Sequence, residues 1–336
     1  MISSNLQPIT IAGKDNRVKL REILTWKFLV YQMALPLLGK LGPKRADSVL
    51  STLGRILVAV SPARLRKLSD SLERISARPE LANELAGGEL RFLSRDYLLE
   101  GRSREESLEL FDVEGEEALL KVLNERKGVV LVGSHFGAHI AAFHWFYDQW
   151  IPIKLMVQRP KHITKRLERF FDADDADPQS NYFLSRALAG TDCVKRLLHA
   201  RNALKSGKAI YLAGDIPWQG GNTRTGQLLG RTLKFLSVWA DLAANTQSPV
   251  FLVFCSHREG GRFSLKIEPF GKVETGSEPT AIKRYLERLD SAIMDNPGDA
   301  VAHLLWPCFG VAKPSSKARG NVALRPSRNA SPIAIP

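Results

Sequence analysis

The stretch that decides the fold is Lys127-Gly128-Val129-Val130-Leu131-Val132-Gly133-Ser134-His135-Phe136-Gly137-Ala138-His139. Its four consecutive apolar residues, Val129 to Val132, predict a short buried strand that begins after a glycine turn. Residues 136–150 then predict a helix, so His135 follows the carboxyl end of the strand. That end is where open α/β sheets bind their ligands. A histidine held there by rigid elements on both sides can be half exposed, as a general base must be.

The sequence beyond this stretch repeats the alternation of strands and helices. Further strands are predicted from apolar or alternating runs at residues 151–157, 209–213, 250–255 and 263–268. The last run alternates cleanly, which is typical of an edge strand or a hairpin arm. Helices are predicted at residues 116–126, 193–205, 235–244 and 280–294. This order predicts an α/β fold with a mixed, partly parallel sheet flanked by helices and with a helical N-terminal subdomain.

The N-terminal subdomain is predicted to consist almost entirely of helices. They are predicted at residues 18–41, 46–60, 62–75 and 84–111, the last one broken near Gly87-Gly88 and Gly101. The apolar-rich residues 28–38 would extend about 16 Å, roughly half the hydrocarbon thickness of a bilayer. They are too few to span a membrane but can lie in its interface beside flanking Lys and Arg residues. An ordinary core helix with a solvated basic face fits the same pattern.

Four regions follow from these patterns. They are a polar tail at residues 1–16, a membrane-associating helical region at 17–111, an α/β domain at 112–310 and a disordered tail at 311–336. The last region is rich in Pro, Ser, Ala, Lys and Arg, a composition that cannot bury enough apolar surface to fold.

The 336 residues carry a formal net charge of +13. Such a charge favours an anionic partner: a nucleic acid, an acidic membrane surface, or a phosphorylated or acidic-protein substrate. A nucleic-acid binder would need a basic stripe interleaved with exposed aromatic residues, and no fingerprint of that kind occurs. No nucleic acid is therefore expected as a partner.

The cysteines and glycines suggest neither a metal site nor a cofactor. Cys193, Cys255 and Cys308 lie far apart and match neither a zinc site nor a disulfide framework, which favours a reducing compartment. The glycine-rich loops match no phosphate-binding spacing, so no cofactor is predicted. No run approaches the roughly 20 apolar residues of a membrane span, and no secretory signal is evident at the N-terminus.

The pieces of the sequence occur in a recognisable order. They are Glu114-Gly115, Gly133-Ser134-His135-Phe136-Gly137, Val157-Gln158-Arg159-Pro160, Lys205-Ser206-Gly207, a strand leading into Asp215, Leu229-Gly230-Arg231, Ser248-Pro249-Val250 and a closing segment at 297–306. In this order, over residues 18–306, the chain resembles the bacterial lipid A lauroyl/myristoyl acyltransferases, within the wider lysophospholipid acyltransferase superfamily.

The resemblance implies transfer of a fatty acyl group from acyl carrier protein or coenzyme A to a hydroxyl of a lipid or glycolipid. Residues 112–310 would form the acyltransferase-like domain, at the cytoplasmic face of the inner membrane and on an anionic membrane surface. His135 matches the family's base, which would take the hydroxyl proton during attack on the thioester. Arg159 matches a basic position that could bind a phosphate or the oxyanion, with a surface ion pair as its alternative. Arg231 and His139 are also assigned to substrate binding.

One position departs from the family pattern, in which the histidine is followed, after four residues, by Asp or Glu. Ile140 occupies that acidic position. Removing the charge of the corresponding acid in serine proteases lowers turnover about 10⁴-fold, so activity would need a replacement. Asp215 could reach the site from a neighbouring strand end, and His139 could take part of the role, whereas Asp148 lies about three turns along the helix. The alternative is a catalytically degenerate family member that only binds lipid.

Several of these residues also fit ordinary structural roles. His135 and His139 have the i, i+4 spacing of a helical zinc pair, but no glutamate lies between them, so no metal site is predicted. His144 and Asp148 can pair on the helix surface. Asp215 can equally serve a cap or a turn. Core or interface packing is predicted for Trp145, Trp150, Trp218 and Trp239.

Overall fold

The computed structural model describes residues 29–94, 96–156, 164, 165, 167, 190–218 and 221–309. The two predicted tails, at residues 1–16 and 311–336, lie outside the described residues. The same holds for Arg159 and for the first part of the helix predicted at residues 18–41.

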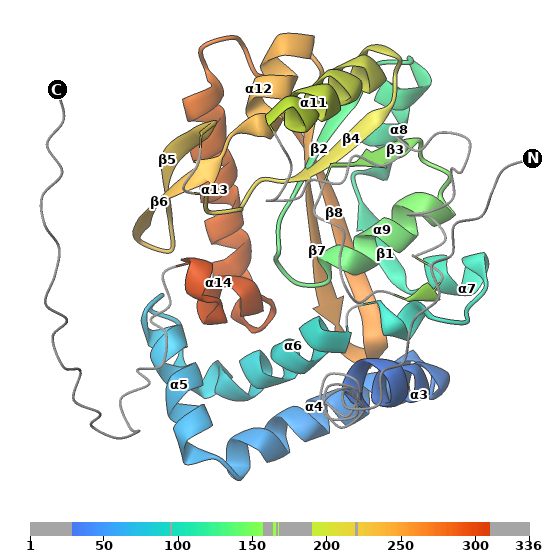
Figure 1. Ribbon diagram of the computed structural model, residues 1–336. Coiled ribbons are helices and arrows are strands. Elements are labelled where there is room, and N and C mark those ends of the chain that lie inside the picture. Colours follow the sequence, from blue (N-terminus) through green and yellow to red (C-terminus); the bar gives the residue numbers. More distant parts are fainter. Residues whose placement is uncertain are drawn as a thin grey trace, which may run out of the picture.

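The centre of the fold is a six-stranded sheet in the order β1-β8-β7-β2-β4-β3 (Figure 1). The strands are β1 (Phe111–Glu114), β2 (Val129–Gly133), β3 (Ile153–Leu155), β4 (Ala209–Ala213), β7 (Val250–Arg258) and β8 (Arg262–Gly271). All neighbours are parallel except β7 and β8, which form an antiparallel hairpin. The predicted α/β fold with a mixed, partly parallel sheet is confirmed. Residues 263–268 are a hairpin arm and not an edge, because β1 pairs with the other side of β8.

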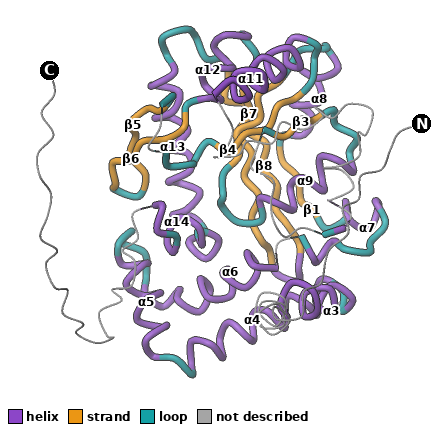
Figure 2. The backbone as a smooth tube through the Cα atoms, viewed as in Figure 1, coloured by secondary structure: helices purple, strands orange, loops and turns teal. Residues whose placement is uncertain are grey.

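Helices cover both faces of this sheet, as the purple and orange segments of Figure 2 show. The helices on one face are α8 (Glu116–Asn124) and α9 (His139–Asp148), and those on the other are α11 (Gly190–Lys205), α12 (Val238–Thr246) and α13 (Glu278–Asp295). Val129 and Leu131 of β2 join the apolar cluster on the first face, and Val130 and Val132 join the cluster on the second. The strand is buried on both sides, as its unbroken apolar run predicts.

The N-terminal helices lie beyond the end of the sheet at which β7 has its carboxyl terminus (Figure 1). They are η1 (Leu29–Ala34), α3 (Leu35–Lys40), α4 (Pro43–Ala59), α5 (Pro62–Glu73), η2 (Pro79–Leu81), α6 (Ala82–Ser94), η3 (Tyr97–Leu99) and α7 (Arg104–Leu108). The short helix η4 (Glu259–Gly261), which follows β7, packs against α4. Near the C-terminal end of the described chain, η5 (Pro297–Asp299) packs against α6 and is followed by α14 (Val301–Leu305) and η6 (Pro307–Phe309). The helical region thus borders the edge of the sheet that carries His135.

Helix α6 runs without interruption through Gly87-Gly88, so the predicted break at this pair was wrong. A Cβ atom at Gly88 would collide with the carbonyl oxygen of Gly298, and Gly54 of α4 lies directly against Gly87. These glycines allow close packing between elements and do not form a turn. The helix predicted at residues 84–111 is shorter in the structure, because α6 ends at Ser94. Phe111, the last residue of the predicted range, is the first residue of β1.

A second, two-stranded sheet was not predicted from the sequence. Its strands are β5 (Thr223–Leu228) and β6 (Arg231–Leu236), joined by Leu229 and Gly230, whose φ angles are 53° and 69°. Most side chains of this hairpin are not buried, and the sequence of β5 shows no apolar alternation. The helix predicted at residues 235–244 was therefore wrong at its start, because Phe235 belongs to β6 and α12 begins at Val238.

Candidate active site

The pairing of β2 with β4 brings two of the predicted site residues together. These parallel strands are in register so that Gly133 lies opposite Ala213. His135 and Asp215 each follow their strand by two residues and therefore lie side by side. Nδ1 of His135 is 3.0 Å from Oδ1 of Asp215, and the main-chain N–H of His135 donates to Oδ2 at 2.7 Å. Asp215 is fully buried, whereas 28% of the His135 side chain is exposed.

A second histidine, His303 of α14, binds the same carboxylate. Its Nε2 lies 2.9 Å from Oδ2 of Asp215, and both side chains are fully buried. Sequence reasoning missed His303, because no motif spacing links it to a position 88 residues away. Its only signal was membership of the closing segment at 297–306. The site is therefore a buried carboxylate shared by two imidazole rings, of which only His135 reaches the surface.

Asp215 is ionised in this setting. Burial by itself would raise the pKa of Asp215, but the charges and hydrogen bonds of His135 and His303 outweigh burial and hold this pKa well below its ordinary value. An ionised carboxylate only accepts hydrogen bonds, so Nδ1 of a neutral His135 carries the ring proton. The opposite nitrogen, Nε2, is then the proton acceptor of the ring. This is the tautomer that a general base requires.

The turn that follows His135 is fixed by β7 and η5. The N–H of Ala138 donates to the carbonyl oxygen of Cys255 at 2.7 Å, and the N–H of Gly137 donates to that of Asp299 at 2.9 Å. Gly137 has a φ of 55°, and a Cβ atom there would collide with the oxygen of Cys255. Only glycine fits this position, which explains why the chain has a glycine two residues after the histidine.

Four aromatic rings, among them that of His135, contact one another in a closed cycle. Ring centroids are 5.3 Å apart for His135 and His139, 5.4 Å for His139 and Phe92, 5.5 Å for Phe92 and Trp306, and 5.6 Å for Trp306 and His135. Helices α6 and α9 and the segment after α14 therefore meet at His135. The rings give the site an aromatic wall that can pack against a substrate. His139 lies next to His135, where the sequence placed a substrate contact, and its role stays a prediction.

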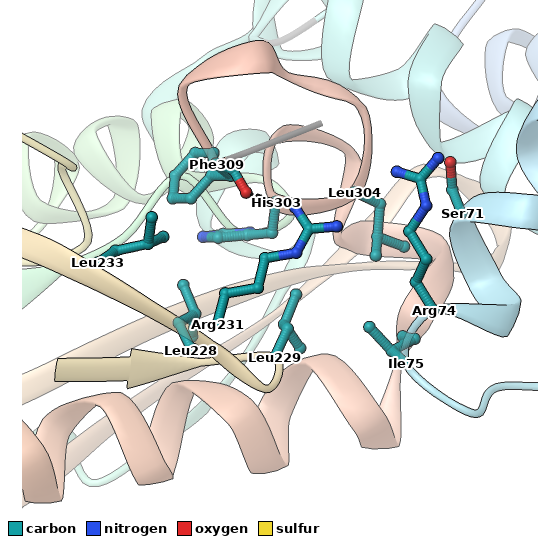
Figure 3. Close-up of a pocket in the computed structure, with 10 residues that line it drawn as sticks. All are labelled: Ser71, Arg74, Ile75, Leu228, Leu229, Arg231, Leu233, His303, Leu304 and Phe309. Carbon is teal, nitrogen blue, oxygen red and sulfur yellow. Dashed lines mark hydrogen bonds between the residues drawn. The ribbon is translucent and has the colours of Figure 1, made fainter. Parts of the chain in front are cut away.

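Arg231, the other predicted binding residue that the structure describes, lines a small cavity that includes His303 but not His135. Its Nη1 donates to the carbonyl oxygen of Phe309 at 2.6 Å. Figure 3 shows its guanidinium in a small cavity together with the ring of His303 and the side chain of Arg74, which follows α5. Arg231 thus faces His303. His303 in turn binds Asp215, and Asp215 binds His135.

Helix α9 carries two further outcomes. Ile140, at the position of the family's acid, is 5% exposed and packs in the apolar core. The predicted surface pair of His144 with Asp148 was wrong, because both side chains are buried. Nε2 of His144 instead lies 2.9 Å from Oδ2 of Asp96, which also accepts hydrogen bonds from the main-chain N–H and the hydroxyl of Thr164.

The remaining predictions concern the packing of the tryptophans and a metal site. Trp145 and Trp239 are buried core residues, whereas 74% of Trp150 is exposed. Within the described ranges, no cluster of three or more His, Cys, Asp or Glu side chains is arranged to hold a metal ion.

A half-exposed histidine, oriented by a buried carboxylate at the carboxyl edge of an α/β sheet, is typical of an enzyme that works by general-base chemistry. A sequence model of the bacterial lipid A biosynthesis acyltransferase family matches residues 99–301, more than half of the chain. The chain belongs to this family and is therefore an acyltransferase that acts on lipid substrates. No curated protein gives a match to the sequence.

Proposed function

We propose that this acyltransferase moves a fatty acyl group from a thioester of acyl carrier protein or coenzyme A to a hydroxyl of a lipid or glycolipid, with His135 as the base. The observation that carries the proposal is the 3.0 Å contact between Nδ1 of His135 and Oδ1 of Asp215. A degenerate lipid-binding member would leave His135 without a carboxylate, and Asp215 supplies one. The carboxylate expected at position 140 is thus provided from the neighbouring strand.

The reaction needs one proton to be moved twice. Nε2 of His135 takes the proton of the acceptor hydroxyl while the hydroxyl oxygen attacks the thioester carbonyl carbon. The tetrahedral intermediate then collapses, the carbon–sulfur bond breaks, and the imidazolium returns the proton to the leaving thiolate. Asp215 stays ionised throughout, keeps the ring in the required tautomer and stabilises the imidazolium.

The oxyanion of the intermediate must be held by groups other than the turn after His135. The main-chain N–H groups of residues 135 to 138 already donate to Asp215, Ser134, Asp299 and Cys255 respectively. We therefore assign the oxyanion or a substrate phosphate to Arg159, which the family resemblance places near the site and which can supply both charge and hydrogen bonds.

The proposal is tested with the purified protein, a labelled acyl thioester of acyl carrier protein or coenzyme A, and a dispersed glycolipid that has a free hydroxyl. We expect one ester to form for each thioester consumed, and the preferred carrier to be consumed faster. Two controls omit the acceptor or replace the thioester by a non-transferable thioether. If every thioester stays intact while lipid remains bound, the protein binds lipid without transferring acyl groups.

We further propose that the enzyme works on an anionic membrane surface, at the cytoplasmic face of the inner membrane, where the N-terminal helices dock. An exposed apolar stripe on α4 and its C-cap residue, spaced 4, 3 and 4 residues apart so that it follows one helix face, consists of Val49, Leu53, Ile56 and Val60. Other exposed apolar side chains near it are Met33, Leu37, Leu41 and Leu65. Exposed cations in the same region are Lys40, Lys44, Arg45, Arg55, Arg66 and Lys67.

Apolar side chains flanked by cations suit the interface of an anionic bilayer. No single helix among the described residues is long and apolar enough to cross a membrane. Helices α4 and α5 would meet the length and composition criteria only when taken together, across a bend of 105°. A peripheral mode of binding therefore explains the α4 stripe without a membrane-spanning segment.

Two aspartates in the α4 stripe, Leu53→Asp with Ile56→Asp, should weaken binding to anionic vesicles. Burying each side chain contributes about 1.5 kcal/mol, so we expect about a 100-fold weaker partition for the pair. Vesicle co-sedimentation measures the change. The matched control is Val194→Asp with Leu198→Asp, two exposed apolar residues one turn apart on α11, whose substitution should leave partition unchanged. Equal losses for both pairs would contradict docking through α4.

A further inference from the structure

A second histidine–aspartate pair repeats the geometry of the first. His257 of β7 donates its main-chain N–H to Oδ2 of Asp299 at 2.8 Å, and its Nδ1 lies 2.9 Å from Oδ1 of the same carboxylate. Asn296 adds a third contact, from Nδ2 to Oδ2 at 3.2 Å. His257 is 9% exposed and Asp299 is 4% exposed, so both are buried. The carboxylate of Asp299 thus joins η5 to the strand next to β2.

This second pair is connected to His135 from two sides. The main-chain oxygen of Asp299 accepts the N–H of Gly137, two residues after His135. Four residues beyond Asp299, His303 binds the carboxylate of Asp215. A shift of η5 would therefore move both the turn that carries His135 and the histidine that holds its acid.

Besides its contact with Asp299, the ring of His257 packs near that of Phe263, with the ring centroids 6.0 Å apart. Its second nitrogen, Nε2, is buried and has no hydrogen-bond partner among the residues that the structure describes. Leaving a buried nitrogen without a partner lowers stability, so an apolar side chain would serve packing better. What His257 provides is the donor at Nδ1, aimed at Asp299.

We infer that His257 and Asp299 are positioning residues of the acyl-transfer reaction, which act through η5 to hold His135 and Asp215 in their productive contact. This inference rests on the proposed function. A misplacement of about 1 Å at a reacting group can lower turnover about 100-fold. The pair would therefore influence the chemical step and not the binding of substrate.

Two substitutions of His257 separate this role from packing. In His257→Asn, the amide Nδ2 can replace the ring Nδ1 as donor to Asp299, whereas His257→Leu has no donor. We expect the Leu variant to lose between about 10-fold and 100-fold in kcat with an unchanged KM for the thioester. The Asn variant should stay within about threefold of wild type, which would show that the donor and not the ring is needed. Equal kcat values for the Leu variant and wild type would overturn the inference.

A double substitution tests the route of the effect. In an Asp215→Asn background, where the contact with His135 is already damaged, His257→Leu should lower kcat little further. A merely structural role would instead give the same fold-loss in both backgrounds. If His257→Leu does not fold, Gly88→Ala displaces η5 from the side of α6, because its Cβ would collide with Gly298, and should give the same kinetic change.

Failure of the positioning role can be distinguished from failure of the proposed function. If the wild type transfers no acyl group, the proposed function fails, and the ¹⁵N-histidine NMR spectrum still tests the inference. The Nδ1–H signal of His135 in its contact with Asp215 should shift or broaden in His257→Leu and be retained in His257→Asn. An unchanged signal in the Leu variant would overturn the positioning role whatever the enzyme transfers.

Discussion

Replacing Asp215 by Asn should lower the turnover of acyl transfer about 10⁴-fold, the loss seen when the acid of a serine-protease triad is neutralised. The carboxylate accepts three hydrogen bonds, two from His135 and one from His303. An Asn side chain has one acceptor oxygen and one NH₂ group, so at least one of the three is lost. When the NH₂ group faces His135, Nδ1 becomes the acceptor and the ring proton moves to Nε2. That nitrogen then cannot take the proton of the hydroxyl.

The measurement is the single-turnover rate of thioester loss per folded molecule. Asp47→Asn is the matched control, because Asp47 is also buried and accepts a main-chain N–H, from Gly260, together with a hydrogen bond from Arg91. Its loss should lower stability but leave turnover within about twofold, because this carboxylate binds Arg91 and Gly260 and neither histidine of the site. Wild-type turnover in the Asp215 variant would show that another group orients His135.

The part of the fold that could be predicted depends on strong local patterns. The strand before His135 is an uninterrupted apolar run, and such a run is buried on both faces only in a sheet covered by two helix layers. The same reasoning applies to residues 209–213, and equal offsets after the two strands suffice to bring His135 and Asp215 together once the strands are neighbours. The register itself is a tertiary property that single-chain periodicity does not contain.

The features that could not be predicted arise from contacts between distant segments. Gly88 signals a helix break by its local preference, but its missing side chain makes room for Gly298. His144 has a carboxylate one turn away, yet it binds Asp96, because α9 is covered on all sides. His303 has no neighbouring motif, and its position follows from the way η5 packs against α6. In each case burial and long-range packing outweighed local propensity.

The carboxylate beside His135 also shows that a histidine can have an acidic partner even when the acidic position of the sequence motif is apolar. Position 140 lies on α9 and faces the apolar core, so a charge there would be buried. Asp215 approaches His135 from β4 instead and gains the hydrogen bonds of two histidines and a main-chain N–H, which outweigh the cost of its burial. His135 therefore keeps a carboxylate partner although the sequence motif has lost one.

Replacing His135 by Ala should lower turnover by about 10⁴-fold, the upper end of what a general base contributes, because Asp215 cannot reach the hydroxyl in its place. Asp215 is fully buried, and His303 still holds its carboxylate when the ring of His135 is removed. Affinity for a non-transferable thioether should stay within about twofold, because the base acts mainly in the transition state. Equilibrium binding and single-turnover rates measure the two quantities separately.

Added imidazole should restore part of the His135→Ala activity, because a free base can enter the space left by the ring. The comparison variant is His139→Ala, which removes the neighbouring ring 5.3 Å away. Losing the contacts of this ring with His135 and Phe92 should lower turnover only about fivefold to tenfold, and imidazole should not restore it. If imidazole fails to rescue His135→Ala and the thioether binds more weakly, His135 shapes the binding site and a different group removes the proton.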